Sequence, residues 1–130
     1  MNQVIPDGDT VIYGFQCDGN HGTWDFSGNS GALDASKIGW FHSQAPCNPS
    51  QWTTNAWHHV QIAYSRDGSG YVTYDAVWLD GAESQIGVTV PSANPLHWEA
   101  GDLLTNFQVD GPAGFGSSIL YLDQLTIYRW

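Results

Sequence analysis

The sequence predicts an all-β fold of the sandwich or barrel class. Short runs of alternating apolar and polar residues recur along the chain, as expected for strands that are buried on one face. Gly, Asn, Asp and Pro separate these runs, and those residues favour tight turns. Patterns typical of amphipathic helices are almost absent, so we expect strands and turns to build the fold.

The alternating runs place strands along the whole chain. In chain order, we expect them at 10–17, 22–26, 37–42, 57–65, 71–79, 85–90, 103–109 and 118–129. The turns between them carry Pro6-Asp7-Gly8, Asp18-Gly19-Asn20, Asp67-Gly68, Asp80-Gly81 and Asp110-Gly111-Pro112. The stretch 43–56, with Pro46 and Pro49, predicts a long loop. Since no repeat, linker or low-complexity segment divides the chain, residues 1–130 are expected to form one domain.

Alternation also assigns faces to two of the expected strands. In 57–65, Val60, Ile62 and Tyr64 fall on the apolar side. The opposite side of this strand carries Trp57, His59 and Gln61. One side of the strand 103–109 carries Asn106 and Gln108, and Asp110 follows directly after that strand. We expect one side of this sheet to pack in the core and the other to recognise a ligand.

The charge balance limits the classes of partner. Thirteen Asp and Glu face three basic residues, so the formal net charge is −10 and the pI is about 4.3. Phosphate binding needs clustered Lys and Arg, so we expect no nucleic-acid partner and no docking on an anionic membrane. No apolar run approaches the roughly 20 residues of a membrane-spanning helix. A neutral partner such as a carbohydrate is compatible with this charge.

Cys17 and Cys47 are the two cysteines of the chain, and we expect them to form one disulfide. A disulfide that closes a loop of about 30 residues, as Cys17 and Cys47 would, stabilises a fold by roughly 3–4 kcal/mol in the chain-entropy model. The alternative is a pair of free, buried thiols. A disulfide in a Trp-rich, Lys-poor chain predicts a secreted, extracellular protein. Because no signal peptide is visible at Met1, we expect a processed form or a fragment of a longer reading frame.

The sequence gives little support for catalysis. Glycoside hydrolysis needs two carboxyl groups held either about 5–5.5 Å or roughly 6.5–9.5 Å apart. Glu83 and Glu99 both fall in expected turns, and no expected strand carries acids at alternate positions. A nucleophile elbow of the Gly-x-Ser-x-Gly type is also absent. We therefore assign no catalytic residue.

Metal binding has no clear motif in the sequence. His58 and His59 are adjacent on an expected strand, so their side chains point to opposite faces and cannot share an ion. Zinc or copper would need distant partners, such as His59 with His42 or His97. We assign no metal site and no cofactor. The alternative is calcium, held by oxygen atoms from the loops around Asp18, Asn20, Asp25 and Asp110.

Seven tryptophans in 130 residues exceed what one small core normally needs. Sugar rings pack their C–H faces on aromatic rings, and their hydroxyls pair with amides and carboxylates. Trp40, Trp52 and Trp98 fall in or near expected loops and would add aromatic surface to the polar strand face. The alternative is that these rings fill the layer between the sheets, where burial of each stabilises the fold by about 1.5–3 kcal/mol.

Residues 57–81 resemble laminin-G-like and concanavalin-like lectin/glucanase domains. The resemblance rests on Trp57-His58-His59-Val60 and on the later hairpin that ends in Asp80-Gly81, and the ending at 120–128 looks like the closing strand of such domains. The chain is also similar to the C-terminal part of a group of secreted bacterial proteins. The resemblance implies an antiparallel, jelly-roll-like β-sandwich of the concanavalin type, truncated at its N-terminus. Its exposed sheet edge would then pair two copies into a homodimer.

These observations together predict non-catalytic carbohydrate binding by a secreted lectin-like domain, with a polysaccharide as the partner. Two alternatives stay open because this fold class hosts several functions. The first is a glycoside hydrolase or polysaccharide lyase whose acids come from loops or from a missing segment. The second is a structural or adhesion module that works through a protein interface.

Overall fold

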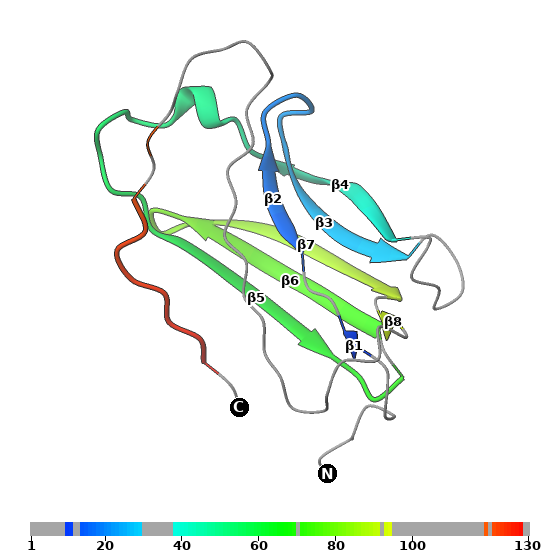
Figure 1. The fold of residues 1–130 in the computed structure, drawn as a ribbon. Helices are drawn as coiled ribbons and strands as arrows, with labels where there is room; N and C mark the ends of the chain where they lie inside the picture. The colour runs from blue at the N-terminus through cyan, green and yellow to red at the C-terminus, as the bar shows by residue number, and fades with distance from the viewer. Residues whose placement is uncertain are drawn as a thin grey trace.

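The computed structural model of the chain describes residues 10–11, 14–29, 38–69, 71–91, 93–94, 119 and 121–128. These residues form three antiparallel sheets with the strand orders β1-β8, β2-β3-β4 and β5-β6-β7 (Figure 1). The strands are β1 (Thr10–Val11), β2 (Phe15–Asp18), β3 (Thr23–Asn29), β4 (Ile38–Pro46), β5 (Val60–Arg66), β6 (Tyr71–Leu79), β7 (Ala82–Pro91) and β8 (Ala93–Asn94). A short 3-10 helix, η2 (Pro49–Gln51), lies between β4 and β5. The predicted all-β class is confirmed.

The hairpin formed by β6 and β7 follows from its turn. Strand β6 matches the predicted range of 71–79 at both ends. The strand predicted at 85–90 begins earlier, at Ala82, because Asp80 and Gly81 adopt positive φ values of 51° and 84° and reverse the chain in two residues. Glu83 therefore lies in a strand, and the prediction that placed it in a turn is wrong.

Two further predictions need correction. The loop expected at 43–56 is too long, because β4 continues to Pro46, which pairs with Thr23 of β3. The strand expected at 118–129 is wrong for residues 119 and 121–128, which belong to no strand. Alternation cannot name a pairing partner, and an extended segment becomes a strand only when its backbone is paired. The strand expected at 103–109 lies outside the described residues.

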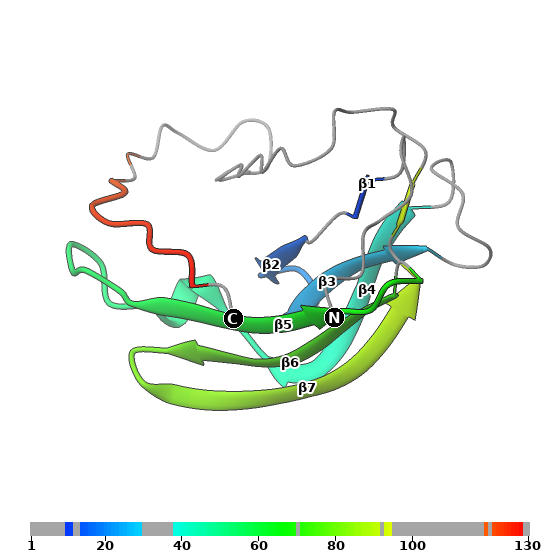
Figure 2. The same cartoon turned by 90° about the horizontal axis from the view of Figure 1, so that it is seen from below.

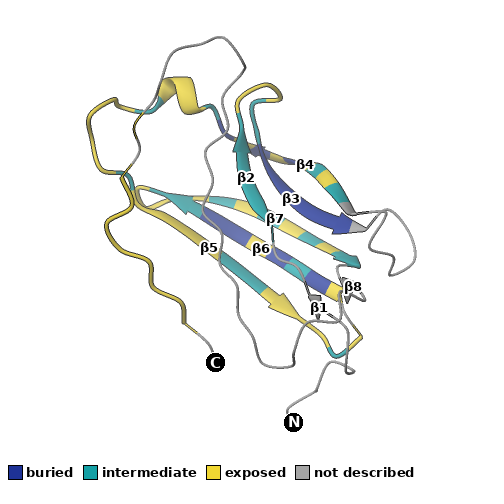
Figure 3. Cartoon of the chain, in the orientation of Figure 1, coloured by how far each residue is buried: buried dark blue, intermediate teal, exposed yellow. Residues whose placement is uncertain are grey.

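The β2-β3-β4 and β5-β6-β7 sheets pack together, with β7 lying next to β3 and β4 (Figure 1 and Figure 2). The contact is largely aromatic, since the ring centroid of Tyr74 on β6 lies 6.0 Å from that of Phe15 on β2 and 5.2 Å from that of Phe26 on β3. Figure 3 shows that β3 and much of β6 are buried, whereas β5 is mostly exposed. The described core therefore lies between the inner faces of β3 and β6.

Tyr74 adds a polar connection inside this core. Its buried hydroxyl donates to the carbonyl oxygen of Ser27 at 2.9 Å and accepts from the Gly14 N–H at 3.2 Å. A buried tyrosine hydroxyl stabilises a fold only when it finds such partners. Tyr74 therefore links β6 to the backbone of β3 and to the residue before β2.

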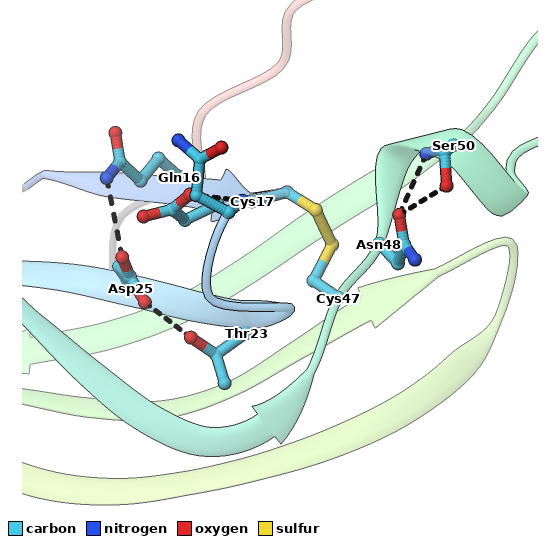
Figure 4. The surroundings of a disulfide bond; sticks show 9 residues. Gln16, Cys17, Thr23, Asp25, Cys47, Asn48 and Ser50 are labelled. Carbon is cyan, nitrogen blue, oxygen red and sulfur yellow. Dashed lines mark hydrogen bonds between the residues drawn. A yellow bond between two sulfur atoms is a disulfide. The ribbon is translucent and has the colours of Figure 1, made fainter.

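The predicted disulfide between Cys17 and Cys47 is confirmed (Figure 4). Cys17 lies on β2, Cys47 directly follows β4, and their Cα atoms are 5.5 Å apart. The Cys47 N–H also donates to the Gly22 carbonyl oxygen at 2.9 Å. Because β2 and β4 flank β3, the disulfide joins the two outer strands of this sheet around the end of its central strand.

Candidate functional site

The outer face of the β5-β6-β7 sheet carries a row of polar and aromatic side chains. The register pairs Gln61 with Trp78 and Trp78 with Glu83 across the three strands. Directly paired residues share a face. The chain neighbours of Trp78, Val77 and Leu79, belong to the hydrophobic core. Because side chains alternate along a strand, the row of three lies on the side facing away from the core.

Hydrogen bonds hold this row in one arrangement. The Trp78 Nε1–H donates to Glu83 Oε2 at 3.2 Å, and Gln85 Nε2–H donates to Glu83 Oε1. Gln61, Glu83 and Gln85 are exposed, whereas Trp78 is half-buried. We name these four residues the Trp78 face. It sets an indole ring between an amide and a carboxylate, and both of these groups can pair with hydroxyls.

A β-bulge marks one limit of the Trp78 face. The register of β6 shifts between Tyr74 and Ala76, so Asp75 is paired in neither ladder. Beyond the bulge, Thr73 and Thr89 pair across β6 and β7, and their hydroxyl oxygens lie 2.8 Å apart. The outer face therefore changes along the strands from indole, amide and carboxylate groups to small hydroxyls.

His58 organises the segment that leads into β5. Its Nδ1 lies 2.7 Å from Asp80 Oδ2, and its Nε2 lies 2.9 Å from the Thr53 carbonyl oxygen. The other carboxylate oxygen of Asp80 accepts the His59 N–H at 2.8 Å. The β6–β7 turn and the start of β5 are thereby held together by one histidine and one aspartate.

These contacts determine the charge of His58. Both of its partners accept hydrogen bonds, so both ring nitrogens must carry protons. The hydrogen bond to the Asp80 carboxylate, and next the one to the Thr53 carbonyl, raise the pKa of His58 above its ordinary value of 6.5. The same contact with His58, followed by the His59 N–H, lowers the pKa of Asp80 below 3.8. His58 and Asp80 therefore form a cation–anion pair at mildly acidic pH.

Trp57 and His59 flank the fixed His58. Trp57 is 70% exposed, which is high for so large an apolar ring. The Asp80 N–H donates to the His59 carbonyl oxygen at 2.8 Å, so His59 already follows the pairing geometry of β5. Alternation then puts the His59 side chain on the same side as Gln61. Two of the predicted binding residues, His59 and Gln61, thus lie together at the Trp78 face, and Trp57 is exposed nearby in the chain.

The other predicted binding residues are distributed differently. Trp40 is exposed on β4, in the other three-stranded sheet. Trp52 is half-buried, with its ring centroid 6.3 Å from that of Trp24 and 5.4 Å from that of His58, so it supports the core and the His58 segment. The remaining four lie outside the described residues: Trp98, Asn106, Gln108 and Asp110.

The prediction missed Trp78, Glu83 and Gln85 as members of the site. A signal was available in the Asp80-Gly81 pair, which is typical of a two-residue hairpin turn. Counting outward from that turn places Glu83 opposite Trp78, as the structure does. The alternation of the strand then brings Gln85 to the same face.

Comparisons with protein-family models, with curated proteins and with solved structures find no significant match for this chain. Within the described ranges, the chain contains no helix with the length and hydrophobicity needed to traverse a lipid bilayer.

Proposed function

We propose that this chain is a non-catalytic carbohydrate-binding domain that binds a polysaccharide through the Trp78 face. The observation that carries the proposal is the row in which Trp78 lies between Gln61 and Glu83. An indole ring can pack against the C–H face of a sugar, while the flanking amide and carboxylate pair with its hydroxyls. The hydrogen bonds from Trp78 and Gln85 to Glu83 reduce the ordering that binding requires.

The charge of the chain supports a neutral ligand. A net charge of −10 disfavours anionic partners, and a neutral glycan brings no charge that must be compensated. We further propose that the domain has the concanavalin-like jelly-roll topology and is exported from the cell. Two antiparallel sheets with an aromatic core support the topology, and the disulfide supports export.

Affinity electrophoresis in gels that contain soluble neutral polysaccharides tests the proposal. We expect Trp78→Ala to weaken retention by about 10–100-fold, since an aromatic side chain buried against a ligand contributes about 1.5–3 kcal/mol. The matched control is Trp40→Ala, which removes a partly exposed indole from the other sheet and leaves retention unchanged. Far-UV circular dichroism establishes that both variants are folded.

Two results contradict the proposal. Wild-type protein that is retained by no polysaccharide and binds nothing on a glycan array is not a carbohydrate-binding domain. Retention that survives in folded Trp78→Ala places the binding surface elsewhere. Release of reducing or unsaturated sugar ends from a bound polysaccharide would instead support the hydrolase or lyase alternative.

A further inference from the structure

Four potential metal ligands meet on the outer face of the β2-β3-β4 sheet. Asp18 ends β2, His21 lies in the turn that follows, Asp25 is on β3 and His42 is on β4. One ligand atom from each residue lies within 4.8 Å of those of the other three. This cluster is on a different sheet from the Trp78 face and is independent of the proposed function.

The backbone brings the four residues together through pairing and a tight turn. Asp25 and His42 are direct partners in the β3–β4 ladder, so their side chains share one face. The turn between β2 and β3 closes through a hydrogen bond from the Gly22 N–H to the Asp18 carbonyl oxygen at 2.8 Å. Gly22 has a φ of 73°, a conformation that suits glycine. The cluster therefore rests on strand register and one closed turn.

Each histidine already faces a carboxylate. His21 Nδ1 lies 2.7 Å from Asp18 Oδ2, and His42 Nδ1 lies 2.9 Å from Asp25 Oδ2. The two imidazole rings stack with their centroids 3.7 Å apart and an interplanar angle of 30°. The stacked rings and the two carboxylates therefore hold their ligand atoms close enough together to face one ion.

Asp25 provides a second, separate indication. Its side chain is 0% exposed, and its described partners are Thr23, Gln16 and His42. Figure 4 shows Thr23 and Gln16 reaching this carboxylate. A buried carboxylate is costly unless a positive charge or a metal compensates it. A cation bound at Asp25 Oδ2 would provide that compensation.

In Asp18 and Asp25, the carboxylate oxygen that does not face a histidine accepts a hydrogen bond, as is typical of metal-binding carboxylates. The Thr23 hydroxyl donates to Asp25 Oδ1 at 2.8 Å, and the Asn20 N–H donates to Asp18 Oδ1 at 2.8 Å. In both residues Oδ1 is thus occupied by a donor, and Oδ2 is directed at a histidine. Outer partners of this kind orient metal-binding carboxylates and strengthen their binding.

We propose that Asp18, His21, Asp25 and His42 form a binding site for a divalent transition-metal ion, with zinc as the best fit. Zinc takes four nitrogen and oxygen ligands at about 2.0–2.2 Å, which sets them roughly 3.3–3.6 Å apart. The observed nitrogen–oxygen distances of 2.7 and 2.9 Å would therefore need to open by about 0.4–0.9 Å. His21 and His42 are 54% and 45% exposed, so an ion from solvent can reach their rings. Two imidazoles disfavour calcium, which prefers six to eight oxygen ligands.

Such an ion would stabilise the sheet rather than catalyse a reaction. It would link the β2–β3 turn to β4 on the outer face, while the disulfide links β2 to the end of β4 on the inner face. All four positions of a tetrahedral ion are filled by protein ligands, which is typical of structural zinc sites.

Isothermal titration of zinc into tag-free protein, first treated with a chelator, tests the site. We expect one zinc ion per chain and a concentration-dependent rise in melting temperature. Thr23→Ala removes an outer partner and should weaken zinc binding by roughly 10–100-fold. His21→Ala and His42→Ala remove ligands and should weaken it further. The matched control is His59→Ala, which removes an exposed histidine directly before β5 of the other sheet and should bind zinc like the wild type.

Cobalt(II) in place of zinc reports directly on the ligands around the ion through its visible absorption spectrum. Cobalt in a four-coordinate site of nitrogen and oxygen ligands produces a visible absorption band, and we expect the wild type and His59→Ala to show it. A wild-type protein without zinc binding overturns the proposal. Unchanged affinity in folded His21→Ala or His42→Ala also overturns it, as does a preference for calcium over zinc.

Discussion

Gly28 offers a direct test of how the two three-stranded sheets pack. It lies on β3 and is buried against β7. A Cβ atom added at this position would lie 2.8 Å from Val90 Cγ2, 3.1 Å from Val90 Cβ and 3.4 Å from Phe41 Cε2. Rotation of Val90 about χ1 can move its Cγ2 but not its Cβ. In Gly28→Ala, β7 must therefore shift relative to β3.

The expected magnitude combines two opposing effects. Inserting a methyl group into a packed interior costs about 1–3 kcal/mol, whereas replacing glycine by alanine at a compatible backbone position stabilises by about 0.4–1 kcal/mol. We expect Gly28→Ala to lower the free energy of unfolding by about 1–2 kcal/mol. Gly39 is the matched control, because it is the direct cross-strand partner of Gly28 and a Cβ there meets nothing within 4 Å. Gly39→Ala should be neutral or slightly stabilising.

Urea unfolding, followed by tryptophan fluorescence, measures these differences as shifts in the transition midpoint. Val90→Ala removes the atom nearest to the new methyl group, so Gly28→Ala and Val90→Ala should couple. We expect the double variant to be more stable than the sum of the two single effects predicts, by about 0.5–3 kcal/mol. If Gly28→Ala matches Gly39→Ala, or if the coupling with Val90→Ala is zero, β3 does not pack on β7 as described.

Two further predictions concern the His58–Asp80 pair and the disulfide. Protonated His58 contributes its full stabilisation below pH 6.5, and this contribution is lost as the pH rises through the raised pKa of His58 in the folded state. Ionised Asp80 contributes above pH 3.8, and this contribution is lost as the pH falls through the lowered pKa of Asp80 in the folded state. The difference in the free energy of unfolding between the wild type and Asp80→Asn should therefore be largest between pH 3.8 and pH 6.5. The control is Asp67→Asn, because the Asp67 carboxylate accepts only backbone N–H groups among the described contacts, and this variant should show no such maximum. A difference for Asp80→Asn that is equal at pH 5 and pH 9 contradicts the pairing. Reduction of the Cys17–Cys47 disulfide, which closes a sequence separation of 30, should lower the free energy of unfolding by about 3.5 kcal/mol, and denaturation curves that coincide with and without reductant would refute this.

Local chemistry made the β6–β7 hairpin predictable. Asp80-Gly81 specifies a two-residue turn, and the turn fixes the register of the strands on both sides. The bulge at Asp75 could not be predicted in the same way. Either set of alternate residues could face the core and give an acceptable strand, so the pattern does not show where one residue is skipped. In β5 the assignment of Val60, Ile62 and Tyr64 to one side holds, since they pair with inward-facing residues of β6.

The histidine–aspartate cluster shows why the rest of the site could not be predicted. His42 reaches Asp25 only through the β3–β4 register, which shifts between Thr23 and Asp25. The sequence carries no turn signal that fixes this register, so the sequence alone suggests His59 rather than His21 as the partner of His42. A site built across strands depends on pairings that are far apart in the chain, and periodicity along one strand does not report them.

Both candidate sites depend on the buried neighbours of their strand residues, and the histidine–aspartate cluster also depends on the β2–β3 turn. Asp25 lies between Trp24 and Phe26, which are both buried in the core, and Trp78 is preceded by Val77, which is fully buried. Because successive side chains of a strand point to opposite faces, fixing the inner residues also fixes the direction of the outer ones. The aromatic core therefore orients the groups on both outer faces before any ligand is present. Ligands that bind such preorganised groups pay little ordering entropy, so a short polar row on strands is suited to ligand binding.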